Sequence, residues 1–197
     1  ETSGQRADTF VPAIMAIAVI STAFTGQAIA VGFDRRYGAL KRLGATAIPR
    51  WGIIVGKTLA VLGVIALQAV VLGAIGLAFG WRPDPAGLAI GVLLMLLGVA
   101  AFSSLGLLLG GPLKAEVVLA LANIIWFGLL GLAGLVVFDD RVPEAVRWLA
   151  RCSPSGALAE ALSVATDQGS FDVFGVVVLL IWAAVGGALA IRWFKFE

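Results

Sequence analysis

Long runs of apolar residues, separated by shorter polar segments, dominate the hydrophobic pattern of this chain. A helix that crosses the roughly 30 Å hydrocarbon core of a bilayer needs about 20 mainly apolar residues, because each residue rises about 1.5 Å. Five segments meet this requirement, and their interiors lack charge except for Lys57, one turn into the second segment. We expect five transmembrane helices, at residues 10–33, 53–80, 87–110, 117–138 and 173–193.

Residues 139–172, between the fourth and fifth spans, are too polar to cross a membrane but contain two amphipathic patterns. Apolar residues recur at helical spacing within 142–150 and again within 158–165. The sequence Ser153-Pro154-Ser155-Gly156 interrupts the pattern between them. We therefore expect a hairpin of two short helices over 142–166, which lies at the outer membrane surface or re-enters the membrane.

The loop at 34–52 carries five of the chain's 14 basic residues. With 111–116 and the C-terminus on the same side, that side holds eight Lys and Arg in its loops, against five on the other. The positive-inside rule then places 34–52 in the cytoplasm. This topology puts the first residue outside with no signal peptide before it, so we expect a further span upstream, six spans in the intact subunit and both termini in the cytoplasm.

Two interpretations of this basic loop fit its residues equally well. Its cations could neutralise anionic lipid headgroups, each contributing about 1 kcal/mol. Alternatively, residues 35–48 could form a short helix that docks on a partner protein, since Leu40, Leu43 and Ala47 recur at helical spacing and would form an apolar stripe.

Composition supports a membrane protein and excludes several kinds of chemistry. The chain is 60% hydrophobic and 13% charged, whereas soluble domains carry about 25% charged residues, and the net charge of +2 does not indicate nucleic-acid binding. The absence of histidine removes imidazole bases and Ser-His pairs, which argues against an intramembrane enzyme. Gly56-Lys57-Thr58 looks like the end of a phosphate-binding loop, but Trp51 occupies the first glycine position, so we expect no nucleotide or other cofactor in this chain.

The spans contain few polar residues and, in their interiors, no carboxylate that could relay protons or sodium ions. This absence weighs against an ion-coupled secondary transporter. We expect the polar side chains to form hydrogen bonds between helices rather than to contact substrate, and we expect glycine pairs at spacing four to allow close helix packing. The polar residues are Ser21, Thr22, Thr25, Gln27, Gln68, Ser103, Ser104 and Asn123, and the glycine pairs are Gly52/Gly56, Gly76/Gly80, Gly87/Gly91 and Gly106/Gly110.

A family resemblance decides between the two interpretations of the loop. Asp34-Arg35-Arg36-Tyr37-Gly38-Ala39-Leu40-Lys41-Arg42-Leu43, followed by Gly56-Lys57, resembles the loop of ABC-2 type transporter permeases. Those proteins show an acidic-Arg-x-x-Gly-Thr/Ala-Leu-x-x-Leu pattern and then a Gly-Lys pair that opens the next span. Asp34 stands where glutamate is usual, and Ala47 and Ile48 separate the family's Thr-Pro pair.

The resemblance implies that the chain is a single transmembrane domain of 197 residues that lacks its first span, from a bacterial inner-membrane exporter. It implies a homodimer or heterodimer of permeases with ATP-binding subunits on the cytoplasmic side, which hold the ATP and Mg and hydrolyse the ATP. Lys57 would anchor the second span at the interface, and a hydrophobic or lipid-like substrate suits the uncharged spans. An ATP-independent secondary transporter or a membrane-anchoring subunit is the alternative. The residues implied to couple the loop to the ATPase are Asp34, Arg35, Arg36, Gly38, Leu40, Lys41, Arg42 and Leu43.

Overall fold

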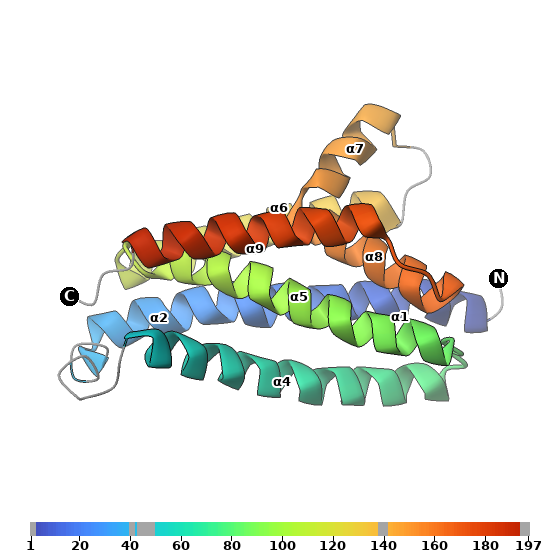
Figure 1. Cartoon of the computed structure of the whole chain (residues 1–197), viewed down its shortest axis with the longest axis horizontal. Helices are drawn as coiled ribbons and strands as arrows, with labels where there is room; N and C mark the ends of the chain where they lie inside the picture. Colours follow the sequence, from blue (N-terminus) through green and yellow to red (C-terminus); the bar gives the residue numbers. More distant parts are fainter. Residues whose placement is uncertain (1–2, 40–41, 43–49, 138–141, 194–197) are drawn as a thin grey trace.

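A computed structural model of the chain describes residues 3–39, 42, 50–137 and 142–193. These residues form a helical bundle without strands (Figure 1). The helices are α1 (Ser3–Val19), the π-helix η1 (Ile20–Gly26), α2 (Gln27–Arg36), α4 (Arg50–Ala78), α5 (Pro85–Gly110), α6 (Ala115–Val137), α7 (Glu144–Cys152), α8 (Pro154–Gln168) and α9 (Val173–Trp193).

Five helical segments are long and apolar enough to cross a membrane, which confirms the all-α membrane fold. The first of these segments, Ala7–Arg36, comprises most of α1 with η1 and α2, and it extends beyond the expected 10–33 at both ends. Pro12, near the start of the expected span, lies well inside α1, where it is fully buried. The expected span 10–33 was too short because a helix forms its own backbone hydrogen bonds whether its side chains are apolar or charged. Hydropathy therefore does not mark where the helix ends.

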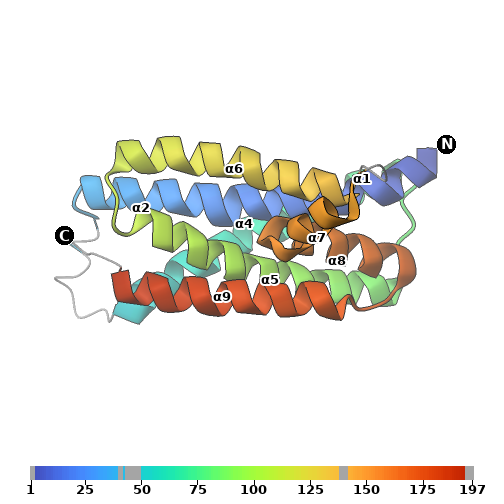
Figure 2. The same cartoon turned by 90° about the horizontal axis from the view of Figure 1, so that it is seen from above.

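Helix α5 occupies the centre of the bundle, between α9 and the first span (Figures 1 and 2). In the most apolar stretch of α5, 56% of residues are buried, against 11% in α4. Small residues explain this position, because an added Cβ at Gly110 would lie 2.4 Å from the carbonyl oxygen of Ala28, and one at Gly106 would lie 2.8 Å from that of Phe24. The expected packing role of this glycine pair is therefore confirmed.

Two short helices form where the hairpin over 142–166 was expected, α7 at Glu144–Cys152 and α8 at Pro154–Gln168. The break between them is Ser153 alone, because Pro154 already begins α8. The Ser153 hydroxyl accepts a hydrogen bond from the Gly156 amide at 3.0 Å and so caps α8, whose first residue is Pro154. Helix α7 projects from the bundle (Figure 1), whereas α8 packs against α1, α5, α6 and α9 and is largely buried. The Trp182 indole, midway along α9, donates to the Cys152 carbonyl at 3.0 Å. The tip of the hairpin thus reaches the middle of the bundle, as a re-entrant segment would.

Candidate functional site

One end of the bundle gathers basic side chains from three helices and one turn, and we call it the basic end. Here α2 ends, α4 begins, α5 turns into α6, and α9 ends (Figures 1 and 2). The segments that the sequence grouped on one side of the membrane therefore do lie together, while their cytoplasmic location stays a prediction. The cations at this end whose side chains the structure describes include Arg35, Arg36, Arg42, Lys57, Lys114 and Arg192.

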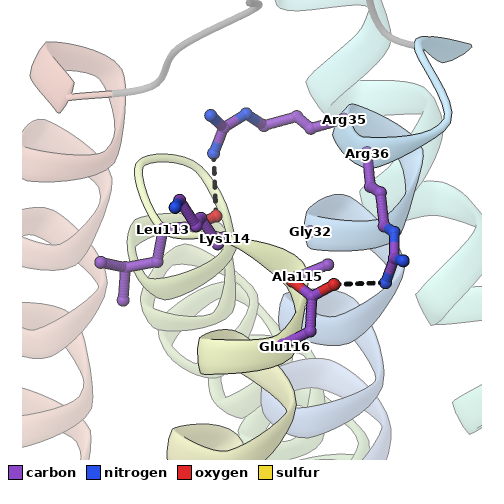
Figure 3. A pocket seen from close by; sticks show the side chains of 7 residues that line it. All are labelled: Gly32, Arg35, Arg36, Leu113, Lys114, Ala115 and Glu116. Carbon is purple, nitrogen blue, oxygen red and sulfur yellow. Dashed lines mark hydrogen bonds and ion pairs between the residues drawn. The ribbon is translucent and has the colours of Figure 1, made fainter.

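Arg35 joins the end of α2 to the turn between α5 and α6. Its guanidinium donates hydrogen bonds to the carbonyls of Gly111 and Leu113, the latter at 3.0 Å (Figure 3). Gly111 is the C-cap of α5, and the carbonyls at a helix C-terminus lack partners within the helix and carry partial negative charge, so the Arg35 cation is favoured there. Its second acceptor, Leu113, belongs to the turn that follows. Arg35 is thus a structural link between the first and third spans.

Arg36 lies beside Arg35 on α2 and forms an ion pair with Glu116 in the first turn of α6 (Figure 3). The two side chains are 50% and 64% exposed, so the pair contributes at most about 1 kcal/mol. A partner protein could therefore replace this contact at little cost. The two arginines, Glu116 and neighbouring residues line an open cavity of about 260 Å³, whose remaining lining residues are Gly32, Leu113, Lys114 and Ala115.

Asp34 and Lys57 form an ion pair that links α2 to α4. Lys57 was expected to anchor the second span at the membrane interface, which stays a prediction, and the structure adds that its ammonium group has a carboxylate partner. The Lys57 side chain is 22% exposed and that of Asp34 is 38% exposed, so the pair is partly shielded from water. Removing one partner should therefore cost more than in a surface pair and less than in a fully buried one.

We expect Lys57→Met to lower the free energy of unfolding by about 1–2 kcal/mol, because it leaves the Asp34 carboxylate partly buried without a cation. Asp34→Asn should act similarly. The double variant should lose less than the sum of the two single losses, which thermal unfolding in detergent can measure as a double-mutant cycle. Strict additivity would show that the two groups do not interact.

Beyond Arg36 the chain leaves the helix through a glycine turn. Gly38 adopts φ +69°, and its amide donates to the Arg35 carbonyl at 3.0 Å. Glycine suits this left-handed position because it has no Cβ to clash, which gives the glycine of the family pattern a physical role. The side chain of Arg42 donates to the Tyr37 carbonyl at 3.3 Å.

The expected separate helix over 35–48 is corrected at its start. Arg35 and Arg36 continue the first span, and the turn begins only at Tyr37. Leu40, Lys41 and Leu43 lie outside the described residues, so the apolar stripe expected for the loop stays a prediction.

Several of the polar residues in the spans do join helices, as expected. Thr22 donates to the Gln68 side-chain oxygen at 3.1 Å, and the Trp126 indole donates to the Ser21 hydroxyl at 2.9 Å. Ser104 and Asn123 instead bond to carbonyls of their own helices. The remaining three, Thr25, Gln27 and Ser103, each keep a buried side-chain polar atom without a hydrogen-bond partner among the residues that the structure describes.

The sequence analysis missed an ion pair inside the hairpin, between Arg151 of α7 and Glu160 of α8. Their side chains are 23% and 20% exposed, and the Arg151 guanidinium lies 4.9 Å from the ring centroid of Trp148 and 5.1 Å from that of Phe174. Burial raises the pKa of the Glu160 carboxyl above 4.5, although Arg151 opposes this shift. Nothing in the sequence signals the pair, because its members are nine positions apart across a proline break.

Comparison with known families agrees with this architecture. The model of the ABC-2 type transporter family matches residues 1–166 of the 197. No curated protein and no solved structure matches the chain significantly. Membership of the family implies, in general terms, dimerisation and association with an ATP-binding subunit. The chain therefore belongs to the ABC-2 type transporter family and is the multi-pass membrane permease component of an ABC transporter.

Proposed function

We propose that this chain is the permease subunit of an ATP-driven exporter, and that its basic end receives movement from a separate ATP-binding subunit. The observation that carries the proposal is the set of links at this end. Arg35 ties α2 to the α5–α6 turn, and the Asp34–Lys57 pair ties α2 to α4. A force on the segment that connects α2 to α4 would therefore act on several spans together.

In this proposal the loop from Asp34 to Leu43 is the coupling element, on the cytoplasmic side of a bacterial inner membrane. Arg36 would exchange its exposed ion pair with Glu116 for an acidic group on the ATP-binding subunit, and Leu40 and Leu43 would supply apolar contact. ATP and Mg would bind to the partner, so hydrolysis would belong to that subunit. Two permease subunits would form the transport pathway. A hydrophobic or lipid-like substrate is favoured because the interiors of the spans offer few charges to stabilise a hydrophilic one.

Co-purification of the intact protein from its native membranes tests this proposal. We expect a soluble subunit to accompany it, identified by mass spectrometry from a G-x-x-x-x-G-K-[ST] peptide, the phosphate-binding loop. Arg36→Glu should reduce its recovery about tenfold or more, since reversing an interfacial charge costs several kcal/mol. Leu40→Asp should act in the same way, by placing a charge in the apolar contact.

Arg82→Glu is the matched control, because Arg82 is an exposed cation in the turn between α4 and α5, and this turn lies at the opposite end of the bundle (Figure 1). It should leave recovery of the ATP-binding subunit unchanged. Absence of such a subunit from wild-type preparations would favour the secondary transporter or the anchoring subunit. Equal recovery with Arg36→Glu and Leu40→Asp would place the coupling surface elsewhere.

A further inference from the structure

The first span is not a regular α-helix throughout its length. Its residues Ile20–Gly26 form the π-helix η1, with α1 before it and α2 after it in one continuous rod (Figure 2). A π-helix closes its hydrogen bonds five residues apart, so this single widened turn holds about one residue more than a regular turn needs. A Cβ at Gly26 would lie 3.5 Å from the Ser21 carbonyl oxygen, five positions earlier, which fits the wider turn.

Close contacts fix the register of the span on both sides of η1. In α2, Gly32 faces α6, and a Cβ there would lie 3.4 Å from the Cβ of Val118. In α1, the Val11 side chain packs against α4, where a Cβ at Gly76 would lie 2.9 Å from it. The widened turn lets both contacts form, although the segment between them has one residue more than a regular helix would take up.

The widened turn also leaves polar groups at its end unpaired. The Thr25 hydroxyl is buried and has no hydrogen-bond partner among the described residues, and the same holds for the Gln27 side-chain nitrogen. In the regular helix α8, by contrast, Thr166 donates to the Leu162 carbonyl, four positions earlier, at 2.9 Å. An α-helical turn at η1 would offer Thr25 the equivalent acceptor, the carbonyl of Ser21. Each arrangement therefore satisfies contacts that the other does not.

The position of η1 connects this turn to the rest of the bundle. It lies near the middle of the first span, Ala7–Arg36, and packs against α4, α5 and α6. The Ser21 hydroxyl accepts a hydrogen bond from Trp126 of α6, and Thr22 donates one to Gln68 of α4. The span is thus held by its neighbours at η1, while α2 extends from there to the basic end.

We propose that η1 is a hinge, at which α2 turns relative to α1 when the hydrogen bonds of this turn change between π and α spacing. The rotation has an upper limit of one residue step, about 100° in a regular helix. The Asp34–Lys57 pair and the hydrogen bonds of Arg35 would carry it to α4 and to the α5–α6 turn. That the rotation accompanies ATP hydrolysis rests on the proposed function, whereas the hinge itself does not.

Deletion of Gly26 tests whether η1 holds a surplus residue. The shortened segment would form a regular turn and keep the registers of α1 and α2, so the melting temperature should stay within about 2 °C of wild type. Deletion of Gly63 is the matched control, since it is also an exposed helical glycine and a Cβ there meets no heavy atom within 4 Å. It lies in α4 between Lys57 and Gln68, and its loss would turn one against the other by about 100°, so the protein should melt about 5 °C lower or more. Equal losses from the two deletions would overturn the proposal.

Hydrogen exchange tests whether the turn moves, and it needs no nucleotide. The amides of a peptide that covers residues 20–31 should exchange about tenfold faster in wild type than in the Gly26 deletion, because each change of spacing breaks backbone hydrogen bonds. Peptides from α5 should exchange equally in the two proteins and serve as the internal control. Mass spectrometry of the purified protein, together with any ATP-binding subunit that accompanies it, measures both. Equal exchange over 20–31 in the two proteins would overturn the hinge.

Cysteine cross-linking, in a protein without its native cysteine, relates the hinge to the proposed function. The pair Gly32→Cys/Val118→Cys on the α2 side has a Cβ separation close to that of a disulfide, so it should cross-link without nucleotide. ATP with vanadate should reduce this cross-link, whereas Val11→Cys/Gly76→Cys on the α1 side should be unaffected. Equal cross-linking of the α2 pair in both conditions, in a preparation that hydrolyses ATP, would overturn the role of the hinge in coupling. Recovery of the ATP-binding subunit should be the same in the Gly26 deletion and wild type, so failure of the partner contact and failure of the hinge are distinguishable.

Discussion

Gly110→Ala is expected to separate α5 from α2 and to destabilise the protein by about 2–3 kcal/mol or more. The new methyl carbon would lie 2.4 Å from the Ala28 carbonyl oxygen and 3.2 Å from the Ala28 Cα. These are backbone atoms of a fully buried residue, so no flexible side chain can move aside. The two helices must shift apart, and apolar contacts along their interface are lost.

Gly131→Ala in α6 is the matched control for this steric argument. A Cβ at Gly131 meets no heavy atom within 4 Å, so the substitution brings only the gain in helix propensity, about 0.5–1 kcal/mol. Thermal unfolding of both variants in the same detergent makes the comparison. Equal melting temperatures would show that α5 and α2 are not packed backbone to backbone.

The same contact should also influence coupling in the proposed exporter. Arg35 reaches the carbonyl of Gly111, the residue after Gly110, from the α2 end that the larger side chain would displace. In the folded fraction of Gly110→Ala, the separation of α5 from α2 should therefore weaken the coupling between the ATP-binding subunit and the spans. This loss would occur without any change in the loop itself.

Hydropathy located the spans well because the thickness of the membrane fixes how long an apolar helix must be. The expected span at 173–193 coincides with α9, and the second, third and fourth differ from the observed helices by at most three residues at either end. The first, at 10–33, falls inside a longer helical segment that begins at Ser3. Hydropathy could not place Arg35 and Arg36 on α2, because a charged residue continues a helix as readily as an apolar one. The stop signal was Gly38, whose left-handed conformation ends the helix.

The polar chemistry was less predictable, since it depends on contacts between distant segments. Thr22 and Gln68 were recognised as candidates for interhelical hydrogen bonds, and they pair with each other. The π-helix at Ile20–Gly26 was not predicted, because its geometry is set by packing and has no distinctive local pattern. The family pattern identified Asp34, but it did not indicate that Lys57 is its partner.

The Arg151–Glu160 pair yields the second large effect that we expect. Glu160→Leu should destabilise the protein by about 3 kcal/mol, because it leaves the Arg151 charge largely buried beside Trp148 and Phe174 without its carboxylate. Arg151→Met should cost a similar amount, through the unpaired Glu160. Because burial dominates the raised pKa of Glu160, the pair does not fully offset its own desolvation. The double variant Arg151→Met/Glu160→Leu should therefore recover most of the lost stability.

The exposed pair Arg36–Glu116 provides the comparison that separates burial from charge pairing alone. Its single variants Arg36→Met and Glu116→Leu should each change the free energy of unfolding by less than about 1 kcal/mol, since water already solvates both groups. Equal losses from the hairpin pair and the exposed pair would contradict a buried hairpin. If the double variant Arg151→Met/Glu160→Leu recovers the lost stability, the ion pair adds little net stability, because apolar side chains can hold the same position without desolvating a charge. Its main role would then be to fix how α7 joins α8 at mid-bundle.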